Sequence, residues 1–209
     1  MIYCKNFITF VSKIKLSLQL MDDINLLEQI KLNNQKAFQE MVIKYQNLVI
    51  NTCYGFLHNQ NDAQDVAQEV FIEVFRSISK FRQESKLSTW LYRISVNKSI
   101  NYIRDNKKNS WFQSLDLLFE KEKAVKEILP DFDTPQEILE KDEKSSSIYK
   151  AIDDLPQNQK IAFTLYKFEN LSYKEISEVM NISLSSVESL IFRSKKNLQS
   201  KLLKYYKKN

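Results

Sequence analysis

The residues best suited to chemistry in this sequence are four successive carboxylates, Asp62, Asp65, Glu69 and Glu73. The last three are each four residues apart, a spacing that places side chains on one face of an α-helix. Carboxylates so arranged can bind a metal ion, but a di-iron helical bundle also needs Glu-x-x-His pairs, and the chain has one histidine, His58. We therefore expect no metal or other cofactor. We interpret the acids either as a solvated helix face or as a surface that binds a positively charged partner.

Residues 76–108, which follow the acids, are strongly basic, with nine Lys or Arg residues against two Asp or Glu residues. Amide and aromatic side chains lie among these bases. Arg can bind phosphates, Asn can bind base edges and an aromatic ring can stack on a base, so the segment has the residue types that single-stranded DNA binding requires. The polar side of the predicted helix offers Tyr92, Arg93, Asn97, Asn101 and Arg104.

Apolar residues at helical spacing predict the elements that position these groups. The acidic segment has the stripe Val66, Val70, Phe71, Val74, Phe75 and Ile78. After a polar loop at residues 81–86, the basic segment has the stripe Leu87, Trp90, Leu91, Ile94 and Ile100. An earlier helix has the stripe Phe38, Met41, Val42, Tyr45, Val49, Thr52, Cys53 and Phe56. We expect all three stripes to be buried, and we interpret Trp90 as a core residue rather than a ligand-binding one.

The composition points to an all-α fold. The 209 residues include one Gly and three Pro, whereas these two residues together make up about 12% of average proteins. Residues 22–75 and 109–154 are net acidic, and residues 76–108 and 155–209 are net basic. This alternation suits two nucleic-acid-binding modules on an acidic linker. No apolar run approaches the roughly 20 residues of a membrane span, and residues 1–20 lack a signal-peptide cleavage site, so we expect a cytoplasmic protein.

The last basic block has the pattern of a helix-turn-helix. Residues 172–175 (SYKE) form a capping box, which predicts a helix over about 173–179. Asn181 falls where the turn needs a left-handed residue. A second helix is predicted to begin at 183–185 and to bury Val187, Ile191 and Leu198. Such a recognition helix reads bases with its first residues and binds phosphates further along.

Two segments of the chain resemble a known protein family. Residues 22–105 resemble region 2 of bacterial sigma factors. These proteins are the promoter-recognition subunits of RNA polymerase. The resemblance is most specific in the D-x-x-Q-E-V-F motif that begins at Asp65 and in FRQESKLSTWLYRI, which begins at Phe81. Region 4 of the same proteins resembles residues 150–202. The order and spacing of the motifs match the small extracytoplasmic-function (ECF) group of the sigma-70 family.

The resemblance implies two small helical domains joined by an acidic linker. Residues 21–108 would form the region 2 domain, which binds polymerase and recognises and melts the minus-10 element. Residues 109–150 would be the linker, and residues 151–209 the region 4 helix-turn-helix domain, which recognises the minus-35 element. We expect residues 1–20 to be an upstream extension that is either disordered or not translated. The implied function is promoter-specific transcription initiation without catalysis by the chain itself. The implied partners are core RNA polymerase, promoter DNA and a membrane-bound anti-sigma factor, with no small-molecule substrate.

The resemblance also assigns each site to particular residues. Core polymerase would bind Asp65, Gln68, Glu69, Phe71 and Ile72. Minus-10 DNA would bind Phe81, Arg82, Glu84, Ser85, Tyr92, Arg93, Asn97, Asn101 and Arg104. Minus-35 DNA would bind Ser185, Ser186, Glu188, Ser189, Phe192, Arg193 and Lys196.

The recognition helix departs from the family wording T-V-K-S-R-L, since this chain has SVESLI at residues 186–191. Glu188 and Leu190 stand at the two positions where the family wording has the basic residues Lys and Arg. A glutamate can accept a hydrogen bond from cytosine N4, but it repels phosphate. We therefore expect an atypical minus-35 element with a cytosine near Glu188.

Two other classes of function stay open at this point. A stand-alone helix-turn-helix regulator would bind duplex DNA without polymerase, but it would have no use for the acidic helix face or for the FRQESKLSTWLYRI segment. A small metal-dependent enzyme is disfavoured because the chain has one His, one Gly and no nucleophile–base pair.

Overall fold

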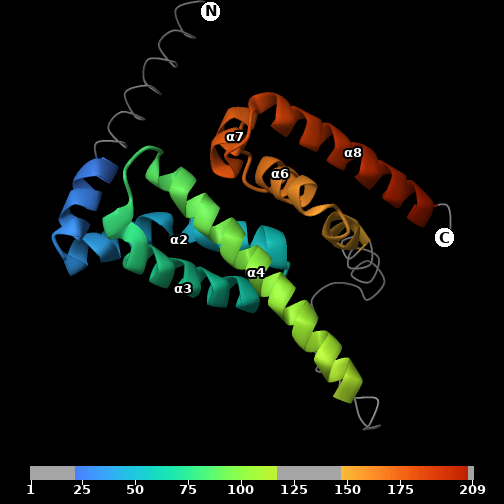
Figure 1. Ribbon diagram of the computed structural model, residues 1–209, viewed down its shortest axis with the longest axis horizontal. Helices are drawn as coiled ribbons and strands as arrows, with labels where there is room; N and C mark the ends of the chain where they lie inside the picture. The colour runs from blue at the N-terminus through green and yellow to red at the C-terminus, as the bar shows by residue number, and fades with distance from the viewer. Residues whose placement is uncertain (1–21, 117–146, 207–209) are drawn as a thin grey trace, which may run out of the picture. The chain divides into compact units, whose positions relative to one another are not determined.

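The computed structural model describes residues 22–116 and 147–206, and every regular element within these ranges is a helix (Figure 1). The all-α fold expected from the scarcity of Gly and Pro is therefore confirmed. Residues 1–20 and most of the predicted linker lie outside the described ranges, so the expectations about them stay predictions. None of the described helices is long and apolar enough to cross a membrane.

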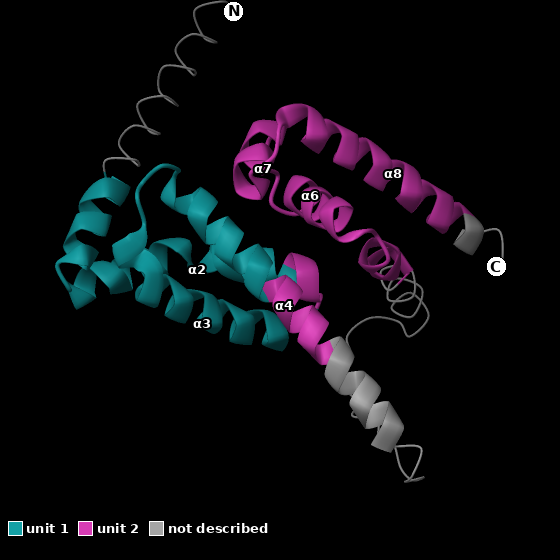
Figure 2. Ribbon diagram, viewed as in Figure 1, with its two compact units in different colours: residues 1–54, 59–98 teal, residues 55–58, 99–209 magenta. Residues whose placement is uncertain are grey.

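The chain divides into two compact units (Figure 2). The first unit comprises residues 1–54 and 59–98, and the second comprises residues 55–58 and 99–209. After a helix over residues 22–31, the chain forms α2 (Gln35–Leu57), α3 (Gln60–Ser77), the short 3-10 helix η1 (Ile78–Lys80) and α4 (Leu87–Asp116). The last turn of α2 and the part of α4 after Lys98 are thus grouped with the second unit.

The core of the first unit is built on α2, whose predicted stripe is largely confirmed. The fully or almost fully buried residues of α2 in this unit are Ala37, Met41, Tyr45, Val49, Thr52 and Cys53. The helices that follow add Val66, Val70, Val74, Leu87 and Leu91. The buried residues recur every three or four positions, so each helix turns one apolar face inward and leaves its charged face exposed.

A buried carboxylate ties the helix over residues 22–31 to α2. Asp23 accepts hydrogen bonds from Lys44 Nζ and from the Tyr45 hydroxyl, each at 2.7 Å. A buried charge is costly unless it is paired and hydrogen-bonded, and here both oxygens of the carboxylate have a partner. The contact therefore holds this helix in one position on α2.

The predicted stripe of α3 is wrong at one residue. Val74 is fully buried, but its neighbour Phe75 is 61% exposed, and Phe71 is half-buried. Successive residues of a helix point about 100° apart, so Val74 and Phe75 cannot both face the centre of the core. The ring of Phe75 instead packs edge-on against Phe38 of α2, with the ring centroids 5.1 Å apart.

The second unit contains a helix over residues 147–153, then α6 (Gln157–Lys167), α7 (Tyr173–Met180) and α8 (Leu184–Tyr206). The last of these packs against both α6 and α7. The core they enclose contains Ile152, Leu165, Ile176, Val187 and Ile191. The burial predicted for Val187, Ile191 and Leu198 is confirmed.

The turn between α7 and α8 has the geometry that the sequence predicts. Ser172 and Glu175 form a reciprocal capping box at the start of α7. Asn181 ends that helix in the left-handed conformation, with φ 54° and ψ 49°. The next helix is capped by Ser183, whose Oγ accepts a hydrogen bond from the Ser186 N–H at 3.2 Å. Two helices joined in this way form a helix-turn-helix.

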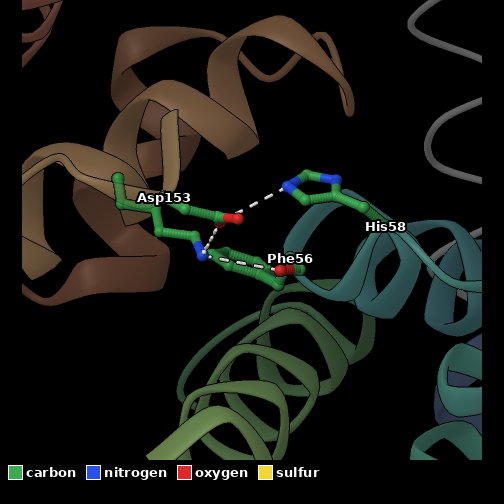
Figure 3. A network of polar contacts seen from close by, with 4 residues as sticks. Phe56, His58 and Asp153 are labelled. Carbon is green, nitrogen blue, oxygen red and sulfur yellow. Dashed lines mark hydrogen bonds and ion pairs between the residues drawn. The ribbon is translucent and has the colours of Figure 1, made fainter. Parts of the chain in front are cut away.

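A polar network in the second unit surrounds Asp153 (Figure 3). Lys160 is 6% exposed, and its Nζ lies 2.6 Å from Asp153 Oδ1 and 3.5 Å from the Phe56 carbonyl oxygen. His58 Nε2 lies 3.5 Å from the same carboxylate oxygen, and the His58 ring stacks on Tyr149. The network therefore pairs the buried ammonium of Lys160 with a carboxylate, which a buried charge requires.

Candidate nucleic-acid interface

The loop between η1 and α4 borders a cavity of about 260 Å³. Two residues set the path of this loop. Lys31 Nζ donates a hydrogen bond to the Phe81 carbonyl at 3.1 Å, and Gln83 adopts the left-handed conformation with φ 59°. The cavity is lined by Ser77, Lys80, Phe81, Arg82, Glu84, Ser85, Trp90 and Arg93. Five of these residues belong to the predicted minus-10 site, and the fold brings them together.

Phe81 forms part of the wall of this cavity rather than a free side chain. It is 8% exposed, and its ring stacks on Trp90 with centroids 4.7 Å apart and planes 23° apart. The adjacent Arg82 and Glu84 are exposed and form a long ion pair of 4.0 Å. The cavity thus joins an aromatic wall to a charged rim, a combination that suits a flat ring carrying polar edges.

The polar face of α4 continues from this cavity. Arg93, Asn97, Asn101 and Arg104 follow helical spacing and share one face of the helix. Asn97, Asn101 and Arg104 are exposed, while Tyr92 is half-buried and lies about 100° away from Arg93 around the helix. The predicted minus-10 residues on this helix are therefore one row of amide and guanidinium groups, with Tyr92 at its side.

The acidic face of α3 is exposed, as the buried apolar stripe on the other side of this helix predicts. Asp65, Gln68, Glu69 and Ile72 all face solvent. Ile72 is 50% exposed at the middle of the face, and Phe75 extends the apolar part of the surface toward α2. Sequence reasoning missed Phe75 because its spacing also fits the buried stripe.

Lys98 of α4 reaches the acidic face of α3. Its Nζ lies 3.8 Å from carboxylate oxygens of both Glu69 and Glu73. The acidic helix α3 and the basic helix α4 therefore interact directly. Glu69, which is predicted to bind polymerase, shares Lys98 with Glu73. Among the described residues, no group of three or more His, Cys, Asp or Glu side chains is placed to hold a metal ion.

All seven residues predicted for minus-35 binding are exposed on α8. The hydroxyl of Ser183, which caps the helix, lies 3.1 Å from that of Ser185 and 2.8 Å from that of Ser186. On the next turns, Lys195 Nζ lies over the Tyr166 ring, 4.8 Å from its centroid. The first turn of α8 therefore offers hydroxyl groups and a helix N-terminus, and the later turns offer basic side chains.

Comparison with known proteins agrees with this arrangement. The family profile for Sigma-70 region 2 matches residues 41–109, and the profile for Sigma-70, region 4 matches residues 145–198. The RNA polymerase sigma-H factor of Pseudomonas aeruginosa is 33% identical over 86% of this chain and 93% of its own length. The ECF RNA polymerase sigma-E factor of Escherichia coli strain K12 is 32% identical over 90% of this chain and 97% of its own length.

Solved structures show the same fold. The structure of CnrH in complex with the cytosolic domain of CnrY superposes with a TM-score of 0.60 at 21% identity, covering 87% of this chain and 97% of the matched chain. The sigma factor RpoE of Bartonella quintana, in complex with the anti-sigma factor NepR, gives a TM-score of 0.53 at 19% identity, covering 80% and 97%. With both sigma regions matched in order and relatives above 30% identity along nearly the whole chain, this protein belongs to the ECF group of RNA polymerase sigma factors.

Proposed function

We propose that this ECF sigma factor binds core RNA polymerase through the exposed face of α3 and reads promoter DNA at two places. The cavity beside residues 81–86 and the polar face of α4 bind the separated minus-10 strand, and α8 binds the minus-35 duplex. The protein acts in the cytoplasm as a specificity subunit and leaves the covalent chemistry to the polymerase. An anti-sigma factor is a further partner, since the matched sigma factor of Bartonella quintana is bound to one.

The cavity at the start of α4 is the observation that carries this proposal. Pockets for drug-sized ligands usually measure about 300–1,000 Å³, so a cavity of about 260 Å³ suits a single nucleobase better than a larger molecule. Proteins that take a base out of the stack hold it by stacking and by hydrogen bonds to its edge. Trp90 supplies an aromatic surface here, while Arg82, Glu84 and Arg93 supply polar groups at the rim.

The free energy of DNA melting explains why polymerase must take part in promoter opening. Stacking in duplex DNA is worth about 1.4 kcal/mol per step, so opening some ten base pairs costs roughly 14 kcal/mol. Each base that stacks on a protein aromatic ring returns about 1–3 kcal/mol. One such cavity cannot offset the cost of melting, and the difference must come from a larger complex. A stand-alone helix-turn-helix regulator is not favoured, because it would need neither the cavity nor the α3 face.

Promoter opening tests the role of the cavity. Holoenzyme carrying Arg82→Ala and Glu84→Ala should open a cognate promoter about tenfold less, measured as permanganate reactivity of unpaired thymines, because the rim contacts to the captured base are lost. Gln46→Ala, at an exposed position of α2, serves as the control. Opening at the wild-type level by the double variant would show that the cavity does not hold a base.

Polymerase binding tests the α3 face separately. Asp65→Lys with Glu69→Lys should weaken assembly with core polymerase, because the change reverses the charge of the surface that meets a basic partner. Glu40→Lys makes the same kind of charge change on an exposed position of α2 and should have little effect. Equal loss in both variants would indicate a general charge effect and contradict the proposed docking face.

A further inference from the structure

The exposed side chains of α8 fall into two distinct rows. One row consists of Leu184, Glu188 and Phe192, each four residues from the next, so that they lie one above another along the helix. Leu184 is 47% exposed and Phe192 is 70% exposed, while Glu188 between them is also exposed. None of these three residues is basic; Lys195, three positions after Phe192, continues the face, and its Nζ lies over the Tyr166 ring.

The second row is displaced by one residue, or about 100° around the helix. It consists of Ser185, Ser189 and Arg193, all exposed, with Lys196 continuing it. Hydroxyl, guanidinium and ammonium groups are the donors that bind phosphate oxygens. The second row therefore suits the DNA backbone, and the first row is left to face something other than phosphate, because its carboxylate would repel phosphate.

The first row has the chemical complement of a pyrimidine strand in the major groove. Cytosine presents the N4 amino donor, which a Glu carboxylate accepts, and thymine presents a C5-methyl group, which apolar side chains contact. Guanine presents only the acceptors O6 and N7, which oppose a carboxylate, and adenine presents the acceptor N7 beside its N6 amino donor. Basic side chains lie close to this row at Arg193, Lys195 and Lys196. Their positive charge favours a polyanion over a protein as the partner of this face.

We infer that the row Leu184–Glu188–Phe192 reads a pyrimidine strand of the minus-35 duplex, with a cytosine at Glu188 and a thymine methyl group at Leu184 and at Phe192. The inference rests on the proposed binding of α8 to promoter DNA and adds the base chemistry. Residues four apart are about 6 Å apart along a helix, and base pairs are about 3.4 Å apart. Each thymine therefore lies about two base pairs from the cytosine.

The first test is selection from a promoter library whose minus-35 positions are randomised, using holoenzyme assembled from the full chain and core polymerase. Wild-type protein should enrich a strand in which cytosine is flanked by thymines at about two positions on either side. With Glu188→Gln, the preference for that cytosine over thymine should fall by about fivefold or more, since the amide is a weaker acceptor and can also donate.

The methyl contacts are tested by replacing single thymines with deoxyuridine, which removes the C5-methyl group and leaves base pairing unchanged. Wild-type holoenzyme should bind the uridine templates more weakly at the two flanking positions. Phe192→Ala should bind thymine and uridine templates equally at one of them, and Leu184→Ala at the other. Leu203→Ala, at an exposed apolar position further along α8, should keep the wild-type ratio.

The outcomes separate this inference from the proposed function. If Glu188→Gln strengthens binding to all templates alike, the carboxylate only repels phosphate and the inference is wrong. If uridine substitution has no effect in any protein, the apolar residues contact something other than thymine, such as a protein, and the inference is again wrong. In both cases a holoenzyme that still requires its minus-35 element would leave the proposed function intact. A holoenzyme that selects no minus-35 sequence would overturn both.

Discussion

The phenyl ring of Phe81 stacks on the indole ring of Trp90, with centroids 4.7 Å apart and planes inclined by 23°. Phe81 is the first residue of the loop, and Trp90 lies in the first turn of α4. The contact therefore joins the start of the loop to the start of α4, and the exposed Arg82 and Glu84 lie on the loop between these two rings. An aromatic wall that is already in place before the ligand arrives lowers the entropic cost of binding.

Substitution of Trp90 should affect stability and promoter opening together. Aromatic pairs contribute about 0.5–1.5 kcal/mol beyond the area they bury, so Trp90→Ala should destabilise the first unit by at least that amount in urea unfolding. It should also reduce the number of heparin-resistant promoter complexes. Trp90→Phe keeps a stacking ring and should retain most of both properties. A Trp90→Ala protein with wild-type promoter complexes would show that the aromatic wall has no part in DNA binding.

Lys98 should weaken polymerase binding by partly neutralising the α3 face. Its Nζ lies 3.8 Å from both Glu69 and Glu73, and the glutamates are 61% and 42% exposed. Exposed ion pairs contribute only about 0–1 kcal/mol, so Lys98→Gln should change stability little. It should nevertheless speed association with core polymerase at low salt, because it leaves the face more acidic. Slower association would indicate that Lys98 itself contacts the polymerase or that the face does not dock there.

The left-handed Asn181 sets the angle between α7 and α8. Asn181→Gly should be tolerated, because glycine adopts a φ of 54° without strain. Asn181→Val should cost on the order of 1–3 kcal/mol, because a β-branched residue is strained in this conformation. Thermal unfolding measures the difference, and minus-35 binding should fall in parallel. Equal stability of the two variants would mean that the turn relaxes without the left-handed residue.

Asp153 should make the stability of the second unit sensitive to acid. Burial acts to raise the pKa of Asp153, but contacts with His58 and Lys160 outweigh it and hold the pKa below the ordinary value of 3.8. Because the pKa is lower in the folded state, Asp153 stabilises the fold fully above that value, and the contribution is lost as pH falls through the folded pKa.

Asp153→Asn therefore tests this network. The variant should be less stable than the wild type at neutral pH, and the difference should shrink as pH falls below about 3.8. Asp154→Asn is the matched control, because Asp154 pairs with Lys201 at the surface and its side chain is 66% exposed. A constant difference between wild type and Asp153→Asn from pH 7 to pH 3 would contradict the account.

Features encoded locally could be predicted from the sequence. The capping box at Ser172 and the left-handed Asn181 depend on a few neighbouring residues, and both are confirmed. The stripe of α2 is confirmed in its central residues because its apolar spacing is regular over several turns. Phe75 departs from the predicted stripe, because spacing alone does not say which of two adjacent apolar residues faces the core. The contact that decides it is with Phe38, 37 positions away along the chain.

The cavity could not be predicted, although most of its residues were. Its shape depends on the path of residues 81–86, which is set by the left-handed Gln83 and by the distant Lys31. The apolar spacing predicts that Trp90 is a core residue, but it is only half-buried and it lines the cavity. The two rows on α8 were not separated either, because Leu184 carries no charge and lies at the helix start.

The most direct test of the central claim is reconstituted transcription with start-site mapping. Core RNA polymerase would be incubated with fragmented genomic DNA of the source organism, with and without the full chain, and the 5′ ends of all transcripts sequenced. We predict starts that appear only with the protein and share two spaced upstream motifs. No new starts, together with tight duplex binding by the protein alone, would contradict the account and favour a stand-alone regulator.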